Sequence, residues 1–242
     1  MRVFYINLAS RPERRDQFLL RNASIADWQR FDAVNGKDID KSDLISQGFM
    51  AEELRKFKPR AYGSALSHKQ LWERCAAGNV PFTIAEDDAV FNKHFTAEAG
   101  RVLEQLPADW DLVRWSWNFD SVLDVEVLPG LRNGVMLFEQ SPLRQRLDDF
   151  QEAKYHPTAL RLWQAFGLAC YTISPKGARY FLETVFPLKN DTVTIRSINR
   201  TITTYCLDTS MCLHYDEAQA YACFPPLVWS ENDKESSPDH LP

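Results

Sequence analysis

Residues 80–91 read V-P-F-T-I-A-E-D-D-A-V-F, and this short stretch constrains the fold more than any other. Its first six residues form an apolar run typical of a strand buried on both faces, as in sheets covered by helices. Three carboxylates follow at once, Glu86, Asp87 and Asp88. In open α/β sheets ligands bind at the carboxyl ends of the strands, so the sequence predicts a binding site here.

The spacing of the carboxylates suggests a metal ion. If the extended conformation persists, Glu86 and Asp88 lie on one side of the strand and Asp87 on the other. Such close like charges raise each other's pKa unless a cation lies between them, and a hard ion such as Mg²⁺ or Mn²⁺ also binds substrate phosphates. The alternative is an acidic turn that caps the next helix. The buried strand favours a site.

The rest of the chain alternates strand and helix patterns, which predicts an α/β domain over residues 1–229 and a flexible polar tail over 230–242 that could close over a ligand. Ser174 is expected to cap a helix that starts at Pro175. The expected strands cover residues 3–8, 28–31, 111–118 and 167–173, with a hairpin of 122–127 and 135–138. One expected helix follows the turn at Pro12. Two others cover 62–75 and 95–106, and a further one starts at Pro175.

Composition excludes several classes of protein. A net charge of −5 argues against a general nucleic-acid binder, and no apolar run is long enough to span a bilayer. The five scattered cysteines contain no C-x-x-C pair and indicate reduced thiols in a cytosolic protein. We therefore expect a cytoplasmic protein, with any membrane contact peripheral.

Some side chains allow more than one interpretation. Arg14 and Arg15 lie in the first turns of a helix, where cations are unfavourable, so they either bind a diphosphate or are simply solvated. His68 is held as a structural group or as support for the site. Trp115 and Trp117 alternate onto one face of a strand, where core packing is favoured over a sugar-binding platform.

Five motifs together resemble glycosyltransferase family 25, the bacterial enzymes of lipopolysaccharide and lipooligosaccharide core synthesis, which are related to the collagen galactosyltransferases. They occur in the family's order and span nearly the whole chain. One departure lies at residues 58–64, which lack the family's common G-E-x-G-C. The motifs are I-N-L from Ile6 with Arg14-Arg15, A-L-S-H-x-x-L-W from Ala65, I-A-E-D-D from Ile84, Y-T-I-S-P-K-G-A from Tyr171, and P-P-L-V from Pro225.

The resemblance implies a GT-A-type, Rossmann-like fold with a mixed, mainly parallel sheet flanked by helices. It also implies a nucleotide-sugar donor, usually UDP-galactose, and inverting transfer to a hydroxyl of a growing glycan or glycolipid. Glu86 and Asp88 would hold Mn²⁺ or Mg²⁺, with His214 as a further ligand or else a satisfied histidine. Asp208 would be the catalytic base, or equally a metal ligand. The residues expected beside the donor are Asn7, Leu8, Arg14 and Asp87.

Three functions are compared on this basis. A metal-dependent glycosyltransferase is favoured, with the metal offsetting charge on the departing diphosphate and a carboxylate deprotonating the acceptor. A phosphohydrolase lacks support, since no nucleophile or second metal cluster is evident. A catalytically silent protein that binds glycan or nucleotide-sugar on the same fold remains the alternative.

Overall fold

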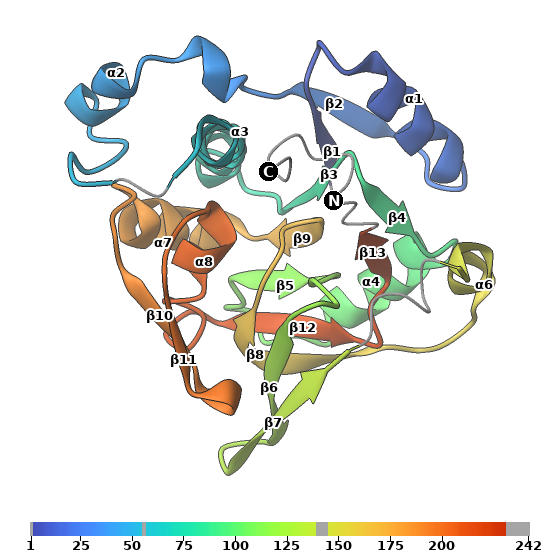
Figure 1. The fold of residues 1–242 in the computed structure, drawn as a ribbon. Coiled ribbons are helices and arrows are strands. Elements are labelled where there is room, and N and C mark those ends of the chain that lie inside the picture. Colours follow the sequence, from blue (N-terminus) through green and yellow to red (C-terminus); the bar gives the residue numbers. More distant parts are fainter. Residues whose placement is uncertain (1, 55–56, 139–144, 231–242) are drawn as a thin grey trace.

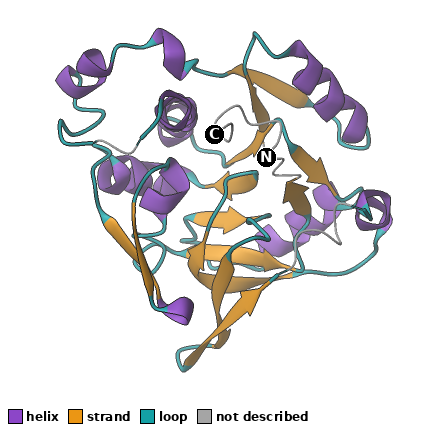
Figure 2. Ribbon diagram, in the orientation of Figure 1, coloured by secondary structure: helices purple, strands orange, loops and turns teal. Residues whose placement is uncertain are grey.

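The structure is a computed structural model that describes residues 2–54, 57–138 and 145–230 (Figure 1). Helices and strands alternate along most of the chain (Figure 2). The strands are β1 (Arg2–Asn7), β2 (Trp28–Asp32), β3 (Phe82–Glu86), β4 (Ala89–Phe91), β5 (Leu112–Arg114), β6 (Val122–Leu128), β7 (Arg132–Leu137), β8 (Thr158–Ala165), β9 (Cys170–Ile173), β10 (Thr192–Ile195), β11 (Arg200–Thr203), β12 (Ala220–Phe224) and β13 (Val228–Ser230). The helices are α1 (Pro12–Arg21), α2 (Lys41–Ser46), α3 (Pro59–Ala76), α4 (Phe95–Glu104), α6 (Leu147–Glu152), α7 (Pro175–Val185) and α8 (Leu207–Met211), with 3₁₀ turns η1 (Gly36–Asp38) and η2 (Arg196–Ile198).

One large mixed sheet organises the described chain, with strand order β2-β1-β3-β9-β5-β12-β8-β6-β7. Strand β1 pairs in parallel with β2 and β3, and β5 pairs in parallel with β12. The other pairings within this sheet are antiparallel. The expected mixed α/β class is confirmed, but the sheet is not mainly parallel, because β9 enters it antiparallel to both of its neighbours.

Helices cover both faces of the sheet and create two hydrophobic cores (Figure 1). Side chains alternate along each central strand, so Phe4 and Ile6 of β1 enter one core while Tyr5 enters the other. The first core packs against α3 and α7, and the second against α1 and α4. Burial on both faces explains the uninterrupted apolar runs of β1 and β3.

Most predicted elements are confirmed, and α7 begins as expected, with Ser174 accepting a hydrogen bond of 2.9 Å from the backbone N–H of Gly177. Trp115 and Trp117 are fully buried, which confirms the interpretation as core. They enter opposite cores, however, because β5 ends at Arg114 and the strand alternation ends with it.

Two regions differ from the expectations. Strand β8 and the β10–β11 hairpin were not predicted. Both are only partly buried, and the hairpin is rich in threonine. Ser230, the expected first residue of the tail, ends β13, which pairs with β4. The rest of the tail, 231–242, lies outside the described residues. All five cysteines are free thiols, and no helix in the described part of the chain is both long and apolar enough to cross a bilayer.

Candidate functional site: an acidic turn at the end of β3

The three carboxylates lie in the tight connection between β3 and β4. Glu86 ends β3, while Asp87 and Asp88 form a turn, so the extended conformation does not persist through them. Strand β1 runs parallel to β3 with Ile6 beside Glu86, which brings the carboxyl ends of the two strands together. Asn7 therefore lies next to the acidic turn, as expected for a site at this edge.

Asp87 is tied to the first strand and the first helix. Its Oδ2 accepts a hydrogen bond of 2.7 Å from Asn7 Nδ2, and its Oδ1 lies 2.7 Å from Arg14 Nε and 2.5 Å from Arg14 Nη2. Asn7 also donates to the carbonyl of Arg11, at the start of α1. Three of the residues expected beside the donor, Asn7, Arg14 and Asp87, thus form one network. The fourth, Leu8, accepts from the Arg11 N–H at the same turn.

The two arginines of α1 have different partners. Arg14 is neither solvated nor free, because its guanidinium binds Asp87 across the sheet edge. The neighbouring Arg15 forms an exposed ion pair with Asp16. The helix tolerates Arg14 near its positive end because an opposite charge meets it there.

Asp88 has one oxygen bound and one left over. Its Oδ2 accepts a hydrogen bond of 2.9 Å from Ser230 Oγ, while its Oδ1 is buried and has no hydrogen-bond partner in the described structure. Burial and the nearby Glu86 carboxylate raise the pKa of Asp88 to about 6. An orphaned buried oxygen with raised proton affinity is the environment that a cation would relieve.

Glu86 lies beside a buried network of His68, Trp72 and Tyr171. His68 Nε2 lies 3.5 Å from Glu86 Oε1 and has no hydrogen-bond partner in the described structure. His68 Nδ1 is 2.8 Å from the hydroxyl of Tyr171, and Trp72 Nε1 donates to the same hydroxyl at 2.7 Å. Burial acts to raise the pKa of Glu86, but His68 and the guanidinium groups of Arg60 and Arg14 lower it below its usual value.

The other expected site residues, Asp208 and His214, lie away from the acidic turn. Asp208 is the second residue of α8, where its oxygens accept from the N–H groups of Gly167 and Thr209 and from the Cys206 thiol. His214 packs beside Tyr180, and burial lowers its pKa. Within the described residues no three His, Cys, Asp or Glu side chains gather as a metal site, so His214 does not join Glu86 and Asp88.

The acidic turn nevertheless fits a divalent cation that needs only one or two carboxylate ligands from the protein. Mg²⁺, and Mn²⁺ in similar sites, is often held by one or two carboxylates and completes its shell with waters and substrate phosphates. Glu86 is one-third exposed and Asp88 has an unbound oxygen, so both can supply oxygen ligands. Asp87 is the poorer ligand, since Asn7 and Arg14 already bind its two oxygens and the guanidinium offsets its charge.

Sequence reasoning missed three side chains of this site. Ser230 was assigned to the tail, Tyr171 to a buried strand and a family motif, and Arg30 to a strand, and none of the three was expected to contact the site. Arg30 donates to the carbonyl and the side-chain oxygen of Asn7 and pairs with Asp32 at 2.8 Å. A usable signal existed for Arg30 alone, because a charged residue in a strand beside the first one points to the same sheet edge.

Comparison with protein families then places the chain. The model of glycosyltransferase family 25, described as an LPS biosynthesis protein, matches residues 1–194. Those residues include the acidic turn and its partners, with the exception of Ser230.

Individual relatives match shorter segments. A human protein named inactive glycosyltransferase 25 family member 3 is 32% identical over 152 residues, covering 53% of this chain and 24% of the relative. A Drosophila melanogaster glycosyltransferase 25 family member is 32% identical over 124 residues, covering 46% and 20%. The chain thus spans about a quarter of the length of these relatives. Among solved structures, the galactosyltransferase LgtC in complex with donor and acceptor sugar analogs aligns with a TM-score of 0.39 and 9% identity, over 92% of this chain and 73% of that one.

Proposed function

The chain belongs to glycosyltransferase family 25, whose model covers 194 of its 242 residues, and on this premise we propose that it transfers galactose from UDP-galactose to a glycan. The acceptor is a hydroxyl of a lipopolysaccharide or lipooligosaccharide core, and the transfer inverts the anomeric carbon. The family's printed description supports this choice of acceptor. We expect the protein to act in the cytoplasm, with peripheral contact to the membrane that carries the acceptor.

One observation carries the proposal. The buried Oδ1 of Asp88 has no partner, and it lies in the turn that follows a central strand. A buried unpaired carboxylate oxygen is costly, and proteins retain such groups chiefly where a ligand satisfies them. A divalent ion held by Glu86 and Asp88 would supply positive charge to offset the charge that develops on the departing diphosphate.

The chain's own residues orient the donor. Asn7 lies at the carboxyl end of β1, where a nucleotide binds in α/β sheets, and Arg30, in the middle of β2, reaches it with its guanidinium. The guanidinium groups of Arg14 and Arg60 act on the carboxylates electrostatically and place positive charge near the diphosphate position. Arg14 is fixed by Asp87, so its position is preorganised before the donor binds.

Asp208 is the proposed base for the acceptor hydroxyl. Its Oδ2 accepts a hydrogen bond of 2.6 Å from Gly167 N–H, and the backbone N–H of Glu86 donates to the carbonyl of Ala169 two residues later. The same short loop therefore connects Asp208 to the acidic turn. Asp208→Asn should lower transfer far more than donor binding if it takes the proton, and should lower neither much if it only holds the loop.

The decisive experiment follows UDP release from a panel of UDP-sugars, with and without Mn²⁺ and with a core oligosaccharide as acceptor. We expect acceptor-stimulated release from UDP-galactose that requires the metal. Asp88→Asn should reduce it by at least about a hundredfold. The matched control is Asp16→Asn, an exposed carboxylate on α1 that forms an ion pair with Arg15, and it should leave the rate unchanged. Metal-independent release, or full activity of Asp88→Asn, would contradict the proposal.

A catalytically silent binding protein is the second candidate. It is favoured by the inactive family members among the relatives and by the lack of a three-residue metal cluster in the described structure. This candidate predicts that UDP or glycan raises the melting temperature while no donor is turned over with any acceptor. Release of UDP at a measurable rate excludes it.

A further inference from the structure

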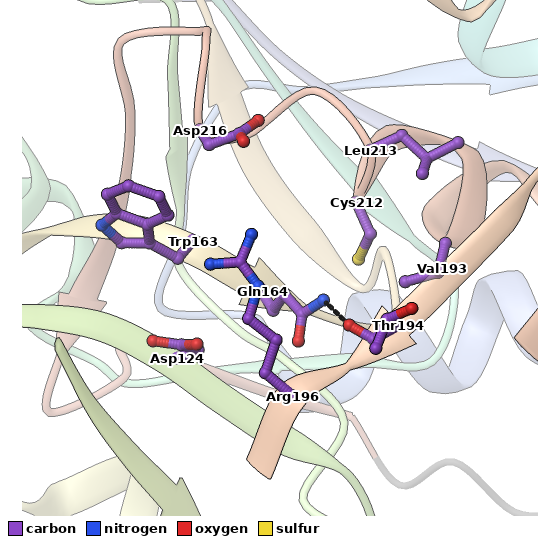
Figure 3. Close-up of a pocket in the computed structure, with 9 residues that line it drawn as sticks. All are labelled: Asp124, Trp163, Gln164, Val193, Thr194, Arg196, Cys212, Leu213 and Asp216. Carbon is purple, nitrogen blue, oxygen red and sulfur yellow. Dashed lines mark hydrogen bonds between the residues drawn. The ribbon is translucent and has the colours of Figure 1, made fainter. Parts of the chain in front are cut away.

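A cavity lies away from the acidic turn, between the β6–β8 part of the sheet, the β10–β11 hairpin and the loop after α8 (Figures 1 and 3). Its volume is about 190 Å³. It shares no residue with the acidic turn or with the network that supports Glu86. The lining residues are Asp124, Trp163, Gln164, Val193, Thr194, Arg196, Cys212, Leu213 and Asp216.

An irregularity in the sheet brings the indole of Trp163 to this cavity. Along β6 and β8, Asp124 pairs with Gln164 but the next residue, Val125, pairs with Leu162. Trp163 is therefore the extra residue of a β-bulge, and a bulge re-aims a side chain that regular alternation would send to the other face. As a result Trp163 and its neighbour Gln164 both line the cavity.

Asp124 is one of the residues that line the cavity, and one of its carboxylate oxygens is buried. Asp124 is 94% buried, and its Oδ1 has no hydrogen-bond partner in the described structure. Burial raises the pKa of Asp124, against the opposing effects of Asn133 and Arg196. A buried acceptor that lines a cavity of this size calls for a donor from a ligand or from water.

The opposite wall supplies further polar groups from the hairpin. Gln164 Nε2 donates to the carbonyl of Thr194 at 2.8 Å, which fixes the amide against β10 and leaves its oxygen free to accept. Arg196 follows β10 and is exposed, and Figure 3 shows its guanidinium extending across the cavity toward Trp163. Asp216 lies at the far rim in the same view.

This combination selects one class of ligand. Two carboxylates against one guanidinium disfavour a phosphate, and the small volume does not suit a nucleotide. A sugar ring has an apolar face for an aromatic side chain and hydroxyl groups that donate and accept around its edge. A carboxylate, an amide oxygen and a guanidinium around an indole match that pattern.

We propose that the Trp163 cavity, defined by Trp163, Asp124, Gln164, Arg196 and Asp216, binds one sugar residue of the acceptor glycan. The ring lies against Trp163, and its hydroxyls donate to Asp124 and Gln164 and accept from Arg196. The assignment of that sugar to the acceptor rests on the proposed transferase function, whereas binding of a sugar in the cavity does not. The cavity then holds the glycan at a distance from the acidic turn, so that it sets which acceptor is used.

The test measures direct binding by saturation-transfer NMR, with lactose, methyl β-D-glucoside and N-acetylglucosamine as separate probes. At least one probe should bind the wild-type protein, and Asp124→Asn and Trp163→Ala should each weaken it by about tenfold or more. Asp124→Asn preserves the shape of the side chain, so it remains informative if Trp163→Ala fails to fold. The matched control is Trp110→Ala, another half-buried tryptophan that does not line the cavity, and it should bind as the wild type does.

The outcomes separate this proposal from the proposed function. If no probe binds, or if the cavity variants bind normally, the sugar site is excluded even when UDP release is intact. If the probes bind through the cavity but no UDP-sugar is turned over, the sugar site stands and the transferase proposal fails. If both hold, the cavity variants should raise the KM for the oligosaccharide acceptor while UDP release without acceptor stays unchanged.

Discussion

The acidic turn and the Trp163 cavity lie at opposite ends of the same sheet and differ in how their polar groups are held. At the acidic turn, parallel strands buried on both faces bring charges together, and most of those charges have partners within the protein. At the Trp163 cavity, antiparallel strands meet a polar hairpin, and the buried Oδ1 of Asp124 has no hydrogen-bond partner among the described residues. Some charged side chains in such a cluster therefore serve to hold the fold together. The atoms that can bind a ligand are those without a partner inside the described structure.

Asp87 and Asp88 provide the sharpest form of this comparison, since they are adjacent in sequence. Asp87→Ala removes the partner of Arg14 and Asn7 in a largely buried setting, so we expect the free energy of unfolding to fall by about 3 kcal/mol. Asp88→Asn keeps the Ser230 contact and removes an unpaired buried charge, so stability should fall little or rise. Urea denaturation of both variants measures the difference.

The interaction between Asp87 and Arg14 can be isolated by a double-mutant cycle. If Asp87 is architectural, Arg14→Ala in the Asp87→Ala background should add little further loss. Equal losses of unfolding free energy from Asp87→Ala and Asp88→Asn would contradict the proposed difference between a carboxylate bound inside the protein and an unpaired one.

The support below Glu86 gives the next largest effect. Tyr171→Phe removes the hydroxyl shared by His68 and Trp72, and leaves both buried ring nitrogens without a partner. We expect a loss of about 2 kcal/mol of unfolding free energy. Tyr155→Phe is the matched control, because that half-buried hydroxyl bonds only the carbonyl of Pro226 among the described contacts. A smaller loss at Tyr171 than at Tyr155 would show that the network is dispensable.

The sequence predicted local features and missed those that depend on long-range contacts. The apolar run of β3 and the Ser174 cap were predictable because burial and capping leave their signals within a few residues. The bond between Asp87 and Arg14 joins residues 73 positions apart. The spacing of the acidic motif predicted Asp87 on the side opposite Glu86 and Asp88, but it carried no information about the partner that each carboxylate meets. The bulge at Trp163 depends on the register of β6 against β8, which no single-strand pattern encodes.

Because of Asp88, lowering the pH should stabilise the metal-free protein and weaken the binding of the metal. Its raised pKa of about 6 means that the folded metal-free protein binds a proton more tightly than the unfolded chain. Asp88 therefore contributes stability to the metal-free protein at low pH, and that contribution is lost as the pH rises through about 6. Metal binding needs the carboxylate, so Mn²⁺ affinity should be full above pH 6 and fall by up to about tenfold, or 1.4 kcal/mol, per pH unit below it.

Calorimetric titration of Mn²⁺ between pH 5 and 8 measures this dependence, because the range spans the Asp88 pKa of about 6. Asp88→Asn should show weak binding that no longer changes near pH 6. Wild-type affinity that stays constant across this range would mean that Asp88 is not a ligand, and that the acidic turn is structural throughout.

The smallest expected effect concerns the other side of the comparison. Asp124→Asn replaces a buried carboxylate whose Oδ1 is unpaired with a neutral group of the same shape. Because no internal partner of that oxygen is lost, we expect the free energy of unfolding to stay the same or to rise by up to about 1 kcal/mol. Thermal denaturation of the variant beside Asp111→Asn provides the contrast, since Asp111 is buried with bonds to Lys176 and to the Gln219 N–H. A loss of stability at Asp124 as large as that at Asp111 would mean that the Asp124 carboxylate holds the sheet together. Asp124 would then have a structural role, as Asp87 has at the acidic turn.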